Sequence, residues 1–310
     1  MVGLAALVTE KPLAQRLKTS LDELRMQTMG TQILFGFQLQ SLFQPGFDQA
    51  GTAERAADAG SLAAILISFA VLIIAPAQHR LVEPGQASRR LLKVSRRCAE
   101  LALGTMAVAL GCISFSITTH LHVPHSGLIA ALVSALGVIL WFGSGIGLAR
   151  MTSIQLPERE AMDLHTRIDQ MLTEARVILP GVQAMMGFQL IVVMTDAFGR
   201  LPQAFQNLHL AGLALTTLST LLLLTPAAVH RIAFSGEDDA RFHVIGTRLV
   251  GAALMPLAAG MAAETFIGTW RLFESFSASL GSAVLALFIL VGAWYALPLW
   301  LRTHITKEAA

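Results

Sequence analysis

The sequence ELRMQTMGTQILFGFQL at residues 23–39 returns in altered form as EARVILPGVQAMMGFQL at residues 174–190, 151 positions later. At this constant offset the two stretches share eight residues, where unrelated stretches of ordinary composition share about one. The shared residues include a Glu and an Arg near the start and the run Gly-Phe-Gln-Leu at the end. The sequence therefore predicts a tandem duplication, and other features can be compared at the same offset.

The composition places this duplicated unit in a membrane. Of the 310 residues, 54% are hydrophobic and 14% are charged, whereas a soluble domain has about 25% charged residues. A spanning helix needs about 20 apolar residues, because a rise of about 1.5 Å per residue must cross about 30 Å of hydrocarbon. Eight stretches qualify, at approximately 26–47, 59–78, 99–119, 127–149, 177–195, 208–229, 249–267 and 278–300. We predict an all-α integral membrane protein with eight transmembrane helices.

The eight predicted spans divide into two four-helix repeats, at residues 1–152 and 153–310. Four is an even number, so both repeats enter the membrane with the same polarity, and we expect a pseudo-twofold axis along the membrane normal. A helix precedes the first span of each repeat. Apolar residues recur on it at helical spacing, as in Leu13, Leu17, Leu21 and Leu24. This pattern predicts an amphipathic helix at the membrane surface in each repeat.

The basic residues predict the orientation and exclude one class of partner. Of the 22 Lys and Arg residues, 19 fall on the side of the membrane that holds both termini. The positive-inside rule therefore places both termini in the cytoplasm. The basic residues do not gather into one soluble arm or domain, so we expect the lipid bilayer as a partner and no nucleic acid.

A second repeated motif follows the second span of each half. Pro76 precedes His79 and Arg80, and Pro226 precedes His230 and Arg231. With the Glu-x-Arg, Gly-x-Gln and Gly-Phe-Gln motifs, this order resembles a bacterial four-span membrane family of unknown function. Some of its members carry the label sodium:proton antiporter. The resemblance implies two fused four-span units, the bacterial cytoplasmic (inner) membrane as location, and assembly of units, which leaves a homo-oligomer open. It implies no mechanism.

Glutamine and glycine residues form the first group of candidate site residues. A spacing of four places Gln32 with Gly36, and Gln183 with Gly187, on one helix face. Two more glutamines follow in the same helices, Gln38 and Gln189. This stripe is predicted either to line a polar path between the repeats or to pack helix against helix, because glycine permits close approach and a membrane glutamine needs a hydrogen-bond partner.

The second group lies at the predicted cytoplasmic boundary and can act as a gate or as an anchor. A histidine that titrates near neutrality can gate a path, whereas an ion-pair network anchors helix ends at the interface. The group consists of Glu23, Arg25, His79 and Arg80 with their counterparts Glu174, Arg176, His230 and Arg231.

The third group is a turn with three histidines, His120, His122 and His125. Three imidazoles in six residues can contact a transition metal. No carboxylate or cysteine accompanies them, so a solvated turn is the simpler interpretation and no metal site is predicted.

Other chemistry has little support in the sequence. The pattern GSGIG at residues 143–147 lies in a predicted span, so we interpret it as a packing face rather than a phosphate loop. No nucleophile, zinc or paired-carboxylate motif appears, so we do not expect an enzyme. We also expect no Asp, Glu, Lys or Arg in the middle of any span, with Glu264 near the outer end of the seventh. An antiporter needs a buried carboxylate, so these spans give that label no support.

Three functional hypotheses follow. The first is a transporter or channel for an ion or small solute, with a path between the repeats. The second is a membrane scaffold or partner-binding protein that transports nothing. The third is a haem or metal carrier that uses His79 and His230, and the sequence names no cofactor.

Overall fold

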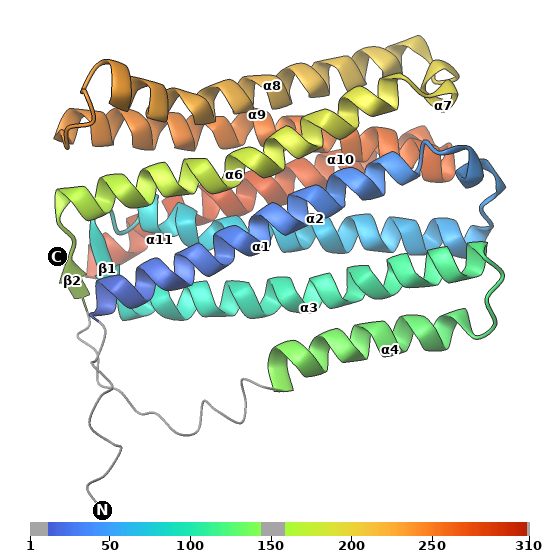
Figure 1. Cartoon of the computed structure of the whole chain (residues 1–310), viewed down its shortest axis with the longest axis horizontal. Coiled ribbons are helices and arrows are strands. Elements are labelled where there is room, and N and C mark those ends of the chain that lie inside the picture. Colours follow the sequence, from blue (N-terminus) through green and yellow to red (C-terminus); the bar gives the residue numbers. More distant parts are fainter. Residues whose placement is uncertain (1–11, 144–158, 309–310) are drawn as a thin grey trace, which may run out of the picture.

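The structure is a bundle of long helices with one small pair of strands (Figure 1). The computed structural model describes residues 12–143 and 159–308. In chain order its elements are α1 (Leu13–Ser41), the 3-10 helix η1 (Pro45–Gln49), α2 (Thr52–Leu81), β1 (Gln86–Ser88), α3 (Arg89–His120), α4 (Ser126–Val138), the π-helical turn η2 (Ile139–Gly143), β2 (Arg159–Ala161), α6 (Leu164–Val193), α7 (Asp196–Gly199), α8 (Gln203–Ile232), α9 (Ala240–Phe273), α10 (Phe276–Val291), the π-helical turn η3 (Gly292–Ala296) and α11 (Leu297–Glu308).

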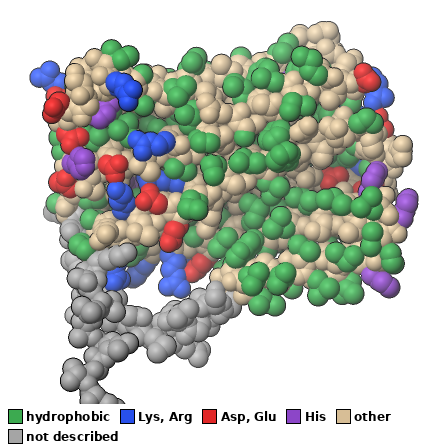
Figure 2. Space-filling model, in the orientation of Figure 1, with side chains coloured by type: hydrophobic (Ala, Val, Ile, Leu, Met, Phe, Trp, Pro, Cys, Tyr) green, Lys and Arg blue, Asp and Glu red, His purple; other side chains and the backbone are tan. Residues whose placement is uncertain are grey.

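Several helices of this bundle identify a multi-pass membrane protein. Within the described residues, six helical segments are long and apolar enough to cross a bilayer: Thr52–Leu81, Arg89–His120, Leu164–Val193, Gln203–Ile232, Ala240–Phe273 and Phe276–His304. A shorter apolar helix covers Ser126–Phe142. On the face shown in Figure 2, charged side chains gather towards the two ends of the bundle, and apolar side chains cover much of the surface between them. This distribution suits helices that lie along the membrane normal.

The two ends of the bundle differ in what they hold. The start of α1, the end of α11 and the strands β1 and β2 lie at one end, which we call the strand end (Figure 1). The strands pair antiparallel, with Ala87 opposite Glu160. The turns at η1 and α7 lie at the other end, the α7 end (Figure 1).

The predicted domain boundary at residues 152/153 and the motif positions 144–147 lie outside the described residues.

The two helices that carry the repeated stretch, α1 and α6, run side by side through the middle of the bundle (Figure 1). Equivalent residues meet between them. The ring centroids of Phe37 and Phe188 lie 4.4 Å apart, and Lys18 pairs with Asp169 at 2.5 Å. A residue that meets its own counterpart lies near the axis that relates two repeats. The predicted parallel arrangement therefore holds along this helix pair.

Away from this pair the repeats depart from the expected twofold relation. The end of the second repeat packs on α2, where the buried indole of Trp294 donates a hydrogen bond to the carbonyl of Ala70 at 3.1 Å and meets the ring of Phe69 edge-on. α10 also packs on α9, as its counterpart α4 packs on α3, but none of the residues 126–138 is buried. A strict twofold axis would give both repeats the same neighbours. The contacts between the repeats are thus not reciprocal.

The leucine stripe before the first span packs against other elements of the protein. Leu13, Leu17, Leu21 and Leu24 are at most 1% exposed, and they pack with residues of α2, β1 and α3. The stripe is also part of one continuous helix, α1, rather than a separate segment. Neighbouring helices of the protein, not lipid, cover it. Amphipathic spacing shows that a face is buried, but not what buries it.

Candidate functional site

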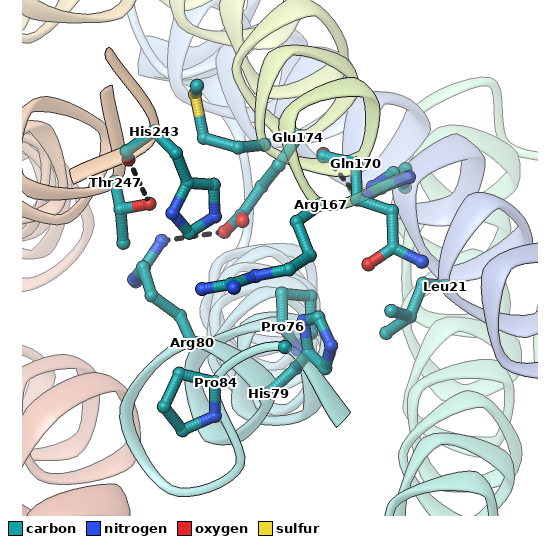
Figure 3. A pocket seen from close by; sticks show the side chains of 13 residues that line it. Leu21, Pro76, His79, Arg80, Pro84, Arg167, Gln170, Glu174, His243 and Thr247 are labelled. Carbon is teal, nitrogen blue, oxygen red and sulfur yellow. Dashed lines mark hydrogen bonds and ion pairs between the residues drawn. The ribbon is translucent and has the colours of Figure 1, made fainter. Parts of the chain in front are cut away.

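A small cavity lies at the strand end where α1, α2, α6 and α9 meet (Figure 3). Its volume is about 40 Å³. Eight of its 13 lining residues have polar side chains: Arg25, His79, Arg80, Arg167, Gln170, Glu174, His243 and Thr247. Four of these belong to the cytoplasmic group that the sequence singled out, and both repeats contribute to them.

An ion pair between the two repeats closes one side of this cavity. The guanidinium of Arg80 on α2 donates to the carboxylate of Glu174 on α6 at 2.7 Å. Their side chains are 5% and 9% exposed. The counterparts of this pair, Glu23 and Arg231, are both exposed. The carboxylate of the second repeat thus pairs with the His-Arg motif of the first.

Arg25 joins the repeats through a second buried contact. Its guanidinium donates to the carbonyl of Gln170 on α6 at 3.0 Å and also pairs with Asp22, one turn earlier in α1. Arg25 is 4% exposed, whereas its counterpart Arg176 is exposed. The same sequence position is thus buried in the first repeat and lies on the surface in the second.

The two equivalent histidines have different surroundings. His79 lies in the cavity wall beside Pro76, with its ring facing the same space as Arg167 (Figure 3). His230 instead stacks on Phe242, with ring centroids 4.5 Å apart. The Nε2 atom of each ring is buried and has no hydrogen-bond partner among the described residues.

The turn after α2 explains how Arg167 reaches this cavity. Gly85 has φ 75°, a left-handed conformation that glycine adopts without strain. A Cβ at this position would lie 2.7 Å from Nε of Arg167. Its counterpart in the second repeat, Gly236, has φ 84°. The two repeats therefore share the turn, and in the first repeat the guanidinium of Arg167 packs over it.

The glutamines of the predicted stripe lie in three different surroundings. Gln32 is 2% exposed, and its side-chain oxygen and nitrogen have no hydrogen-bond partner among the described residues. It packs against Gly181 so closely that a Cβ there would lie 1.7 Å from the Gln32 oxygen. Gln183 is exposed on α6. Gln38 and Gln189 are buried, each within its own repeat. These four side chains do not line one common path.

Gln38 and Gln189 each hold a buried carboxylate that the sequence analysis missed. Nε2 of Gln38 donates to Asp58 at 3.0 Å, and Nε2 of Gln189 donates to Glu264 at 2.8 Å. Asp58 and Glu264 are 6% and 3% exposed. Asp58 lies near the start of α2 and Glu264 lies in the last third of α9, so neither contradicts the expectation for the middle of a span. The burial of both carboxylates was not expected. The predicted span edges excluded Asp58, but α2 begins at Thr52, and α9 continues past Glu264 to Phe273.

His209 completes the site of the second repeat. Its Nδ1 lies 3.1 Å from a carboxylate oxygen of Glu264, and its Nε2 lies 3.0 Å from the carbonyl oxygen of Gln189. A carbonyl oxygen only accepts, so Nε2 must donate to it. Nδ1 therefore faces the carboxylate, and a hydrogen bond between them needs a proton on one of the two atoms. We call Gln189, His209 and Glu264 the second polar site, and Gln38 with Asp58 the first polar site.

The offset of 151 shows that the two polar sites are equivalent. Gln38 corresponds to Gln189, and Asp58 corresponds to His209. The acid lies on α2 in the first repeat and on α9 in the second, where Glu264 corresponds to Ile113. Comparing Asp58 with His209 at this offset is the signal in the sequence that could have found both sites.

A cavity of about 430 Å³ adjoins the first polar site at the α7 end. Gln38, Glu54, Asp58, Ser116 and His120 contribute polar groups to its wall. This volume is large enough for several water molecules or a hydrated ion. The carboxylate of Asp58 therefore lies beside space that a small polar species can occupy.

One of the three histidines of the predicted turn, His120, lines this cavity. His120 ends α3, with Nδ1 4.0 Å from the carboxylate of Glu54. His122 and His125 have left-handed φ values of 54° and 61° in the turn that follows. Within the described residues, no group of three or more His, Cys, Asp or Glu side chains is placed to hold a metal ion.

An acidic residue outside the spans links the repeats at the α7 end. Asp48 of η1 accepts hydrogen bonds from Arg271 at 2.8 Å and from Arg200 at 2.6 Å. These bonds, with the positive charges of the same two residues, lower the pKa of Asp48 below its ordinary value of 3.8. The first repeat thus supplies the anion and the second both cations.

The fold and its polar sites define a multi-pass membrane protein built from two tandem repeats. The chain belongs to the family of unknown function DUF6328, whose model matches residues 9–144 and again residues 157–298. The double match confirms the tandem duplication that the repeated stretch predicted. No curated protein and no solved structure shows significant similarity to the chain.

Proposed function

We propose that the protein is an eight-span transporter of the cytoplasmic membrane that moves protons or another small cation, and that it catalyses no chemical reaction. The observation that carries this proposal is the pair of buried carboxylates, Asp58 and Glu264, inside membrane-spanning helices. An ionisable group within a span is costly to insert, by about 2.5 to 3.5 kcal/mol at the centre, and such groups are kept mainly for function.

The second polar site supports a role for protons. His209 and Glu264 are both buried, and Nδ1 of the imidazole lies 3.1 Å from a carboxylate oxygen. Pairs of this kind relay protons in membrane pumps and transporters. The first polar site has an acid without a histidine partner, and it lies beside the 430 Å³ cavity, which supports access for a cation from the α7 end.

The charge distribution supports an orientation. The predicted spans put 19 of the 22 Lys and Arg residues on the side of the membrane that holds both termini. We propose that the strand end, with both termini, faces the cytoplasm and that the α7 end faces outward.

A scaffold that transports nothing is the second candidate, and one observation favours it. The repeats pack closely along α1 and α6, where Gly181 receives Gln32 and Gly36 receives Phe188. A path between the repeats would require these contacts to open. In the proposed transporter, the cation therefore passes the polar site within a repeat. In a scaffold, the polar sites would serve only for packing.

Flux measurements in proteoliposomes distinguish the two candidates. We expect a pH gradient to drive proton or sodium flux through the wild-type protein, and a variant with both Asp58→Asn and Glu264→Gln to lose that flux. Glu23→Gln is the matched control, because it removes a carboxylate that is exposed on α1. A wild-type protein that is folded and inserted but carries neither cation would support the scaffold.

A further inference from the structure

The cavity at the strand end holds more positive than negative charge. Three guanidinium groups, those of Arg25, Arg80 and Arg167, line it together with one carboxylate, that of Glu174. Asp22 pairs with Arg25 from outside the lining. One guanidinium charge thus remains without a matching anion. Arginine keeps its charge when it is buried, so an unmatched guanidinium needs a counter-ion.

Several donors of these side chains are also without partners. Nε and Nη2 of Arg80, Nε of Arg25 and Nε of Arg167 are buried and make no hydrogen bond to a described residue. Nε2 of His79 is also buried and makes no hydrogen bond to a described residue. The side chain of Arg80 is only 5% exposed, so bulk water cannot readily satisfy its donors. A buried donor without a partner costs about 1 to 3 kcal/mol, and more if it is charged.

We propose that this cavity binds a phosphate oxyanion, held by Arg80, Arg167 and His79. The planar fork of a guanidinium matches two oxygens of a phosphate group, and charge-assisted bonds of this kind are about twice as strong as neutral ones. Figure 3 shows the side chains of Arg80 and Arg167 approaching the same space from α2 and α6, with His79 on the same side as Arg167. The anion would therefore bridge the two repeats, parallel to the ion pair of Arg80 with Glu174.

The size of the cavity and its place agree with this ligand. A volume of about 40 Å³ accommodates about three water molecules, or the oxygens of one phosphate group. In the orientation proposed above, the strand end faces the cytoplasm, where basic pockets meet the phosphates of anionic lipids. A lipid headgroup and free phosphate therefore offer the same chemistry, and the experiment must separate them.

The test uses the full chain in a neutral sugar detergent and isothermal titration calorimetry. Inorganic phosphate is titrated in one arm and dihexanoyl phosphatidic acid in the other. The test variant is Arg167→Gln, and the matched control is Arg16→Gln, which removes the same group at the equivalent position of the first repeat. A melting curve of each protein shows that it is folded. If Arg167→Gln does not fold, Arg167→Lys is used in its place. This variant keeps the positive charge and removes only the planar guanidinium group.

We expect the wild-type protein to bind one of the two ligands, and Arg167→Gln to bind it at least tenfold more weakly while Arg16→Gln retains wild-type affinity. We expect Arg167→Lys to bind the same ligand severalfold more weakly than the wild-type protein does. Binding of inorganic phosphate identifies a free anion, and binding of phosphatidic acid alone identifies a lipid headgroup. The proposal is overturned if neither ligand binds the wild-type protein, or if Arg167→Gln and Arg16→Gln bind equally well. Because binding is measured without a gradient, the result does not depend on transport.

Discussion

The first and second polar sites occupy equivalent places in the two repeats but are built differently. Both hold a carboxylate against a glutamine of the repeated stretch. In the first repeat the carboxylate is Asp58 on α2 and lies beside a large cavity. In the second it is Glu264 on α9, and His209 occupies the place of the aspartate. In both repeats a buried acid meets the glutamine of the repeated stretch, but the acid lies on a different helix, and the second site adds a histidine beside it.

We expect the largest effect when the buried carboxylate of each polar site is removed, with a larger loss in the free energy of unfolding at the second site than at the first. Glu264→Ala leaves His209 and Gln189 buried without a shared acceptor, so we expect a loss of about 3 to 5 kcal/mol in the free energy of unfolding. Asp58→Ala leaves Gln38 and Ser116 without their carboxylate partner beside a cavity that can hold water, and should cost about 1 to 3 kcal/mol. Unfolding by SDS titration measures both. Equal losses would show that His209 adds nothing to its site.

The next effect concerns glycines at equivalent positions of the repeats. Gly181→Ala places a methyl group on Gln32 and should destabilise the protein by about 1 to 3 kcal/mol. Gly30, its counterpart, has no atom within 4 Å of a new Cβ. Gly30→Ala should therefore be neutral or stabilise the helix by up to about 1 kcal/mol. The same SDS titration checks this, and a similar cost at both positions would contradict the asymmetric packing of α1 on α6.

A smaller effect sharpens the comparison by rebuilding one site as the other. Asp58→His combined with Ile113→Glu gives the first repeat the residues of the second polar site. Ile113 lies in the wall of the cavity next to Asp58, so the new side chains are placed to meet. A double-mutant cycle should show a favourable coupling of about 0.5 to 3 kcal/mol between them. Additive single effects would indicate that the two sites differ in backbone geometry as well as in residues.

The smallest effect tests the link between the repeats at the α7 end. The pKa of Asp48 is lowered in the folded state, so its contribution is present above the unfolded pKa and is lost as pH falls through the folded pKa. Its side chain is 40% exposed, and screening by water should keep the contribution below about 1 kcal/mol. Asp48→Asn should therefore lower stability slightly at neutral pH and remove that part of the acid dependence. If the variant is as stable as wild type at pH 7 and its stability falls in acid as that of wild type does, other carboxylates cause the loss of stability in acid.

Much of the architecture could be predicted from the sequence, because the repeat and the length of the apolar segments are direct consequences of duplication and of bilayer thickness. The family match confirms the duplication. The position of the cytoplasmic group was also informative, since Arg25, His79, Arg80 and Glu174 lie around one cavity.

The differences between the repeats could not be predicted, since equivalent residues have different neighbours. Gln32 is buried under Gly181, whereas its counterpart Gln183 is exposed. Asp58 was missed for another reason. A hydropathy window ends where polar residues begin, but α2 extends several residues beyond that point, and packing buries the aspartate inside the helix. Tertiary contacts, which sequence spacing does not contain, decide both outcomes.

The central claim, that the polar sites carry transport, is tested most directly by proton flux in proteoliposomes under a fixed pH gradient. We expect Asp58→Asn and Glu264→Gln each to reduce the flux, the double variant to abolish it, and Glu23→Gln to behave as wild type. A double variant that is correctly inserted and conducts at the wild-type rate would contradict the claim.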